Sequence, residues 1–105
     1  MSNAPPPFAE LLRHHREAQG QPLRAVAEKL QVDISLVSKW ERGERKPSRD
    51  EVSALAKCLK ADRKQLLVAY LRDKVMYEVQ NDEFALDALK AAEAQVKYQA
   101  KGQRN

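Results

Sequence analysis

The chain has 105 residues, of which 43% are hydrophobic and 6% aromatic, the size of one small domain with a mainly aliphatic core. Its single cysteine excludes a disulfide within the chain and is typical of a reducing compartment. No run of apolar residues approaches the roughly 20 that a membrane-spanning helix needs. The net charge of +4 is modest, but residues 34–49 hold five basic and two acidic side chains, a local excess that favours contact with phosphate.

Residues 1–7 are expected to form a disordered leader. Three consecutive prolines, Pro5–Pro7, cannot join a helix, and the residues before them offer nothing to pack. The segment has neither the basic region nor the apolar run of a secretion signal. We therefore expect the protein to be cytoplasmic.

Two short helices are predicted after the leader. In both, apolar or half-apolar residues recur at i, i+3, i+4 and i+7, the spacing of one helix face. They are Phe8, Leu11, Leu12 and His15 in the first helix and Leu23, Val26, Ala27 and Leu30 in the second. Gly20 ends the first helix. Pro22 suits the first position of the second, where its missing N–H costs nothing.

A third helix is predicted from Asp33 to Arg42, after a connection of only two residues. Asp33 is a good N-cap, because its carboxylate can accept the exposed N–H groups of the first turn. Gly43 ends the helix, since glycine readily takes left-handed angles. A helix, a tight turn and a second helix have the spacing of a helix-turn-helix.

The third helix divides into two faces on a helical wheel of 100° per residue. Leu36, Val37 and Trp40 share the apolar face, which we expect to pack on the first two helices. The opposite face carries Ile34 at its edge and Ser35, Ser38, Lys39 and Arg42. Lysine donates to guanine, serine pairs with several bases, and isoleucine contacts a thymine methyl. An ordinary solvated face would show the same residues, so the wheel alone leaves both interpretations open.

Three further helices are predicted. Ser48 and Glu51 have the pattern of a capping box at the start of a fourth helix, and Asp62 with Gln65 repeats it before a fifth. The inward residues of the fourth helix are Val52, Leu55, Ala56 and Leu59. The fifth helix carries the apolar residues Leu66, Leu67, Tyr70, Leu71, Val75 and Val79. Asn81 and Asp82 cap a last helix from Phe84 to about Tyr98, with residues 101–105 expected to fray.

The segment from Leu23 to Pro47 closely resembles the Cro/C1-type (XRE-like) helix-turn-helix family. The specific elements are Val26-Ala27, Val37-Ser38, Trp40-Glu41-Arg42-Gly43, and Pro47 leading into helix four. The resemblance covers roughly residues 8–71. It implies an all-α fold, a five-helix lambda-repressor-like DNA-binding domain at 8–79, with an additional C-terminal helix and tail at 80–105.

The resemblance also implies roles for individual residues. Ile34, Ser35, Ser38 and Lys39 match base-contacting positions. Phosphate contacts are expected from Arg42, and also from Arg24, Arg45 and Lys46. Arg16 and Glu41 match a salt bridge between helices one and three whose role is structural.

Three residues depart from the family pattern. Gln31 stands where glycine is common, so a residue with a side chain must take the left-handed turn, at a cost of about 1 kcal/mol. Leu23 replaces a polar residue that commonly holds the DNA backbone, and Pro22 replaces a serine or threonine cap. We therefore expect weaker anchoring at the start of helix two.

The C-terminal third predicts a two-fold dimer. Its apolar stripe is longer than a small monomer tolerates on its surface. The residues expected at the interface are Leu67, Tyr70, Leu71, Val75, Leu86 and Leu89. Such a dimer would place two recognition helices about 34 Å apart on a roughly palindromic operator. The alternative is that the last helix folds back on its own domain.

No catalytic or metal-binding pattern accompanies these features. Cys58 has no His nearby in sequence to form a nucleophilic set. The side chains of the adjacent His14 and His15 diverge by about 100° and cannot share a metal. We expect no enzyme activity and no cofactor.

The leading interpretation is a sequence-specific transcription regulator that binds double-stranded DNA, as a repressor or controller of its own operon. Residues 73–79 also resemble the tails of small regulators encoded beside DNA methyltransferase or restriction genes. The alternatives are an antitoxin that binds its operator and a toxin, or an adaptor that keeps the fold but binds protein. Retained cations at Lys39, Arg42, Arg45 and Lys46 count against the adaptor.

Overall fold

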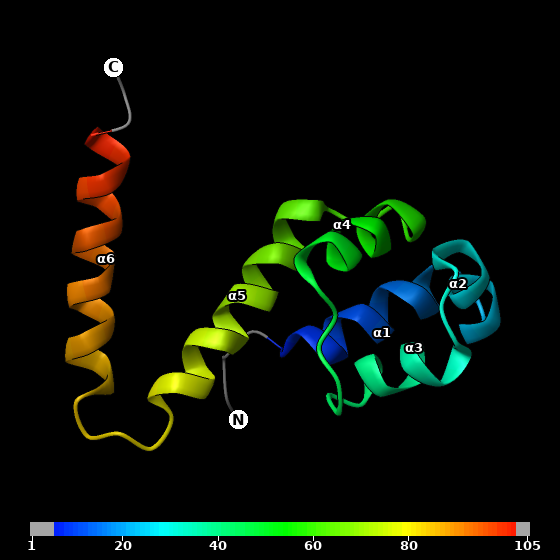
Figure 1. Ribbon diagram of the computed structural model, residues 1–105, viewed down its shortest axis with the longest axis horizontal. Helices are drawn as coiled ribbons and strands as arrows, with labels where there is room; N and C mark the ends of the chain where they lie inside the picture. The colour runs from blue at the N-terminus through cyan, green and yellow to red at the C-terminus, as the bar shows by residue number, and fades with distance from the viewer. Residues whose placement is uncertain (1–5, 103–105) are drawn as a thin grey trace. The chain divides into compact units, whose positions relative to one another are not determined.

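The computed structural model describes residues 6–102, which form helices and their connections (Figure 1). The helices are α1 (Phe8–Ala18), α2 (Leu23–Leu30), α3 (Ile34–Glu41), α4 (Arg49–Cys58), α5 (Arg63–Val79) and α6 (Ala85–Gly102). The predicted all-α class is confirmed. Most of the expected leader and the end of the expected frayed tail lie outside the described residues. Within them, no helix is both long and apolar enough to cross a membrane.

The chain divides into two compact units, Met1–Lys74 and Val75–Asn105. The sequence placed a boundary five residues later, between 79 and 80. The first unit contains α1–α4 and the start of α5, and the second contains the end of α5 and α6.

The core lies in the first unit and draws on all five of its helices. In it α3 lies against α1 and α2, and α2 also lies against α4. The largest side chains with almost no exposed surface are Leu12, Val26, Val37, Trp40, Val52, Leu55, Leu59 and Leu66. Most are aliphatic, as the low aromatic content requires. Their burial supplies the main stabilisation of so small a domain.

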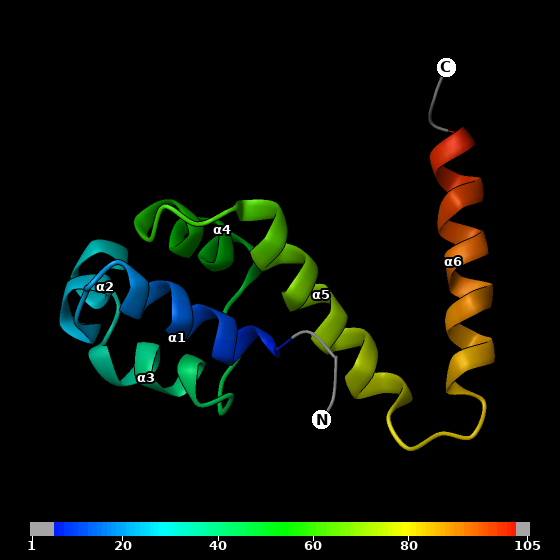
Figure 2. The same cartoon turned by 180° about the vertical axis from the view of Figure 1, so that it is seen from behind.

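Figure 2 shows the short connection between α2 and α3. Gln31 in this connection has left-handed backbone angles. Gln31 has φ 58° and ψ 46°. Its N–H donates to Glu28 O at 3.3 Å, and the Val32 N–H donates to Ala27 O at 3.0 Å. This is the hydrogen-bond pattern that usually ends a helix at glycine. The expectation of a left-handed residue with a side chain here is confirmed.

The N-terminal caps of the helices agree only in part with those predicted from the sequence. Ser48 and Glu51 form the predicted capping box, with bonds of 2.8 and 3.1 Å. Asp33 is the N-cap of α3, but its side chain makes no capping bond, so that detail of the prediction is wrong. Pro22 is the N-cap of α2 rather than its first residue. In α3 the carbonyl oxygen of Asp33 accepts the first helical bonds in the ordinary way.

The last two helices also differ from the prediction in detail. Asp62 caps α5 by accepting from Lys64 N at 2.9 Å, but the Gln65 side chain bonds His15 Nε2 at 3.0 Å instead of completing a capping box. Asp82 accepts from Phe84 N at 2.8 Å. The helix that follows extends through Gly102, so fraying from residue 101 is wrong for the described residues.

The start of α1 is capped from the far end of the first unit. Its N-cap is Pro7, whose side chain cannot accept a hydrogen bond. The Asp73 carboxylate accepts instead from Phe8 N at 2.8 Å, and Arg72 donates to both Pro6 O and Asp73. The Phe8 and Tyr70 rings meet edge to face beside these bonds. These contacts join the first helix to the fifth.

We expect Gln31→Gly to raise the free energy of unfolding by about 1 kcal/mol, because glycine takes the left-handed conformation without strain. Urea unfolding measures the change. Gln19→Gly is the matched control, since Gln19 also follows a helix but has right-handed angles (φ −86°). There glycine adds only unfolded-state entropy and should not stabilise. Equal effects of the two substitutions would contradict the strain at Gln31.

Candidate nucleic-acid interface

Helix α3, the predicted recognition helix, is anchored by its apolar face. Val37 and Trp40 have 0% and 1% of their surface exposed, and Leu36 is half-buried against the core. The division of the helix predicted by the wheel is therefore confirmed on its buried side. Trp40 is a core residue and is not available to stack on a base.

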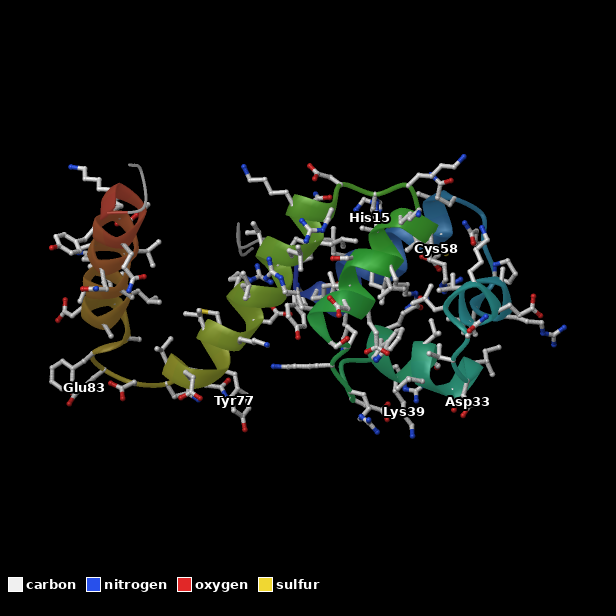
Figure 3. All side chains as sticks on the ribbon, turned by 45° about the horizontal axis from the view of Figure 1, so that its top comes forward. His15, Asp33, Lys39, Cys58, Tyr77 and Glu83 are labelled. Atoms are coloured by element: carbon white, nitrogen blue, oxygen red, sulfur yellow. The ribbon has the colours of Figure 1, made fainter. Side chains whose placement is uncertain are left out.

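The residues predicted to contact bases keep accessible surface. Ile34 is 46% exposed, Ser35 is exposed, and Ser38 and Lys39 are half-buried. Figure 3 shows Lys39 and Asp33 along the outer edge of α3. None of the four lies in the hydrophobic core. Accessible polar groups on an anchored helix are what a base-reading surface requires.

The predicted phosphate contacts flank this surface. Arg24 is exposed in the first turn of α2, and Arg42, Arg45 and Lys46 are exposed in the connection from α3 to α4. The last three line one surface hollow of about 290 Å³, together with Asp73 and apolar residues of α1. The cations that are close in sequence are thus also gathered in space.

The end of α3 has a defined geometry. Gly43 has φ 73°, its N–H donates to Trp40 O at 3.3 Å, and the Glu44 N–H donates to Lys39 O at 2.9 Å. This pair of bonds is a Schellman motif, and the left-handed angle explains the glycine. The motif sets the direction in which the cationic connection leaves the helix.

Arg16 and Glu41 form the ion pair that the family resemblance implied. Arg16 Nε and Nη2 donate to the two carboxylate oxygens of Glu41 at 2.6 and 3.0 Å, and Nη1 donates to Gln21 O at 2.9 Å. Only 14% and 7% of the two side chains are exposed. The hydrogen bond that Arg16 donates to Glu41 raises the pKa of Arg16 above its ordinary value despite the partial burial. This bidentate pair fixes the recognition helix to α1.

The connection after α3 contains a second pair, which the sequence did not predict. Arg42 Nε donates to the Glu44 carboxylate and Nη1 donates to Ser38 Oγ. The Glu44 bond raises the pKa of Arg42, and the same bond lowers the pKa of Glu44, with Lys39 contributing. Glu44 is two residues from Arg42 in an irregular segment, so helical periodicity could not have identified it.

Two other contacts were not predicted from the sequence, for a different reason. Asp73 caps α1 from 65 residues away, and the Gln21 side chain donates to Cys58 O from 37 residues away. Both are products of packing, with no local signal. Cys58 itself is half-buried, and its thiol lies 3.9 Å from Gln21 Oε1.

Among residues 6–102 no three His, Cys, Asp or Glu side chains gather in a way that would hold a metal ion. His15, half-buried, is engaged with Gln65 instead.

Residues 7–68 match the family model described as a helix-turn-helix domain. The chain belongs to this family. The match spans the five helices from α1 into α5 and includes the anchored helix and its flanking cations. The Cro-like, XRE-like resemblance read from the sequence is thereby confirmed.

Two solved structures share the fold. The clp gene regulator ClgR from C. glutamicum is 26% identical with a TM-score of 0.55, and the match covers 63% of this chain and 86% of that one. The DNA-binding domain of the P22 C2 repressor, residues 1–76, is 27% identical with a TM-score of 0.56, covering 64% and 86%. No curated protein matches the sequence closely. The chain has the fold of helix-turn-helix DNA-binding regulators.

We expect Arg16→Met to lower the free energy of unfolding by about 3 kcal/mol, because it leaves the Glu41 carboxylate buried without its partner. Thermal or urea unfolding measures the loss. Arg13→Met is the matched control on the same helix. Its pair with Glu17, at 3.4 Å, is 63% and 56% exposed, and its loss should cost less than about 0.5 kcal/mol. Similar costs for both would contradict the inference that the buried Arg16 pair stabilises the fold more than an exposed pair does.

Proposed function

We propose that this protein is a sequence-specific transcription regulator that binds double-stranded DNA, as a repressor or controller of its own operon. The observation that carries the proposal is the division of α3 into a buried apolar face and an accessible polar face. Its Trp40 side is sealed in the core, while Ser35 and Lys39 keep accessible surface beside a group of exposed cations. Such a protein acts where the chromosome is, and the single cysteine fits the same compartment, the cytoplasm.

Base reading falls to Ile34, Ser35, Ser38 and Lys39. An α-helix fits the major groove, where lysine can donate to guanine O6 and N7, serine can pair with several bases, and isoleucine can contact a thymine methyl. Side chains near the start of a recognition helix reach deepest into the groove. Ile34 and Ser35 occupy the first two positions of α3.

Phosphate binding falls to Arg24, Arg42, Arg45 and Lys46. Charge is unevenly distributed along the chain in a way that supports this assignment. Residues 1–74 contain fifteen basic and ten acidic side chains, whereas residues 75–105 contain four and five. The positive excess therefore belongs to the part that contains α3, and the C-terminal part is a poor partner for DNA.

The assembly we propose is a homodimer on a roughly palindromic operator, and the structure changes the list of interface residues. Leu67 and Tyr70 were expected at the interface, but they are 5% and 6% exposed in the core of their own domain. Those two assignments are wrong, because the preceding helices already cover both side chains. Leu71 and Val75 remain, at 45% and 41% exposed.

Val68 joins them on α5. It is 56% exposed, and with Leu71 and Val75 it gives an apolar spacing of three and four along the helix. In α6 no residue is buried; Leu86 is 63% exposed and Leu89 is half-buried. Isolated exposed apolar residues are ordinary, but a recurrent helical stripe favours a partner helix. A second copy supplies the same stripe and the two-fold symmetry that a palindrome needs.

The similarity of residues 73–79 to regulators encoded beside methyltransferase or restriction genes supports a controller of such a locus as the finer assignment. A toxin is the other candidate occupant of the exposed α6, which would make the protein an antitoxin that binds its own operator. The accessible polar face of α3 is common to both.

Lys39→Ala should lower affinity for the preferred site by about 1–3 kcal/mol at particular base positions, because a base-edge donor is removed. Arg45→Ala should weaken all sequences alike and reduce the salt dependence of binding by about one phosphate contact. Selection of sites from random DNA, followed by salt titrations on the selected and a scrambled duplex, separates the two effects. An unchanged sequence preference in Lys39→Ala would refute the assignment of base-reading residues.

Leu71→Glu should convert the dimer into a monomer, because it places two charges in the apolar contact without disturbing the domain's own core. Light scattering at micromolar concentration measures the mass. Ile34→Glu is the matched control, since Ile34 is equally exposed, at 46%, but lies on α3; it should leave the mass unchanged. A wild-type protein that is a 12 kDa monomer, both free and on DNA, would rule out the dimer.

A further inference from the structure

The hydrogen bonds of Arg42 connect two residues of different chemistry on the proposed DNA face. Nε donates to the carboxylate of Glu44, which follows α3, and Nη1 donates to the hydroxyl oxygen of Ser38, one turn earlier in the helix. Arg42 and Glu44 are exposed and Ser38 is half-buried, so the chain of three side chains lies on the surface. Glu44 is the one acidic member of an otherwise cationic connection between α3 and α4.

The backbone holds the ends of this chain in place. Ser38 and Arg42 are four residues apart, the spacing at which helical side chains face one another, and Arg42 N also donates to Ser38 O at 3.1 Å. Glu44 is fixed by the Schellman motif, in which its N–H donates to Lys39 O at 2.9 Å. Its side chain is therefore presented beside Arg42 by the geometry that ends the helix.

We propose that Glu44 is a specificity-determining residue, which holds Arg42 against Ser38 and thereby makes the Ser38 hydroxyl a hydrogen-bond donor to a base. The inference rests on the proposed DNA-binding function and adds to it. A hydroxyl has one proton and two lone pairs, whereas a guanidinium only donates. When Ser38 Oγ accepts from Arg42, its own proton is directed elsewhere.

The chemistry of the major groove then limits which base Ser38 can meet. Guanine offers the acceptors N7 and O6, adenine offers N7, and thymine offers O4, whereas cytosine offers a donor. With one lone pair occupied by Arg42, Ser38 keeps its proton and a single lone pair, which favours donation to an acceptor base over acceptance from cytosine. A serine without the Arg42 bond could accept from cytosine as readily as donate to the others, and would discriminate less.

The same pairing restrains binding to unselected DNA. Glu44 places a negative charge against Arg42 and would face the negative phosphates, so Arg42 contributes less than a full cation to the backbone. Loss of Glu44 should let Arg42 act as a full cation at the backbone, a gain of at most one phosphate contact. One additional phosphate contact steepens the salt dependence by about 0.9, which is about a 3.5-fold greater loss of affinity between 50 and 200 mM salt.

The first test uses the protein without DNA. Nuclear magnetic resonance titration should find the pKa of the Glu44 carboxyl group lower in the wild type than in Arg42→Met, since the lowered pKa of Glu44 arises mainly from the Arg42 hydrogen bond. Identical titration of Glu44 in the two proteins would show that the pair does not form and would overturn the inference.

The second test uses DNA selected from a random pool by the wild type, Glu44→Ala and Ser38→Ala. Both variants should lose the discrimination against cytosine at the same base position, and Glu44→Ala alone should bind scrambled DNA more tightly with the steeper salt dependence. Glu28→Ala is the matched control, because it removes an exposed carboxylate from α2; it should leave the base preference unchanged.

The outcomes separate this inference from the proposed function. If the wild type selects a sequence and Glu44→Ala selects the same one with equal stringency, Glu44 has no role in specificity, and the DNA-binding function stands. If Glu44→Ala and Glu28→Ala change binding identically, the effect is one of net charge and the inference is wrong. If the wild type selects no sequence at all, the proposed function fails and the inference fails with it.

Discussion

The burial of Trp40 is the constraint on which the rest of the molecule depends. A helix as short as α3, with eight residues, is not stable alone in water, so its conformation must come from packing. Trp40 and Val37 supply that packing against α1 and α2. The burial fixes the rotation of the helix about its axis. It thereby decides which side chains remain outside, and the accessible face is a consequence of the core.

Polar contacts further fix the helices that the apolar core packs together. The Arg16–Glu41 pair bonds α3 to α1 through two hydrogen bonds, one to each carboxylate oxygen. Its largely buried charges add directional precision that apolar packing lacks. Asp73 performs a comparable role at the other end of α1, where proline leaves the helix start without a side-chain cap. The two contacts hold the first helix between the recognition helix and α5.

The two units differ in the kind of surface they present. The first has a complete apolar core and a cationic, hydroxyl-bearing face. The second contains no buried residue in its own helix α6 and has almost balanced charge. In the function we propose, the first unit recognises DNA and the second assembles with another protein chain. Within α5 the difference is between faces of the helix, since one set of its residues is buried in the core while Val68, Leu71 and Val75 are left accessible.

The sequence by itself determined the helices, the helix-turn-helix spacing and the inward face of α3, because helical periodicity and capping act between residues a few positions apart. It also identified Gln31 as a left-handed residue and Arg16 with Glu41 as partners, through family resemblance. Only the tertiary structure decided that Leu67 and Tyr70 are buried, that Asp73 caps α1, and that Glu44 binds Arg42. The first two depend on which helices meet after folding. The third depends on the angles of an irregular connection, for which residue spacing provides no rule.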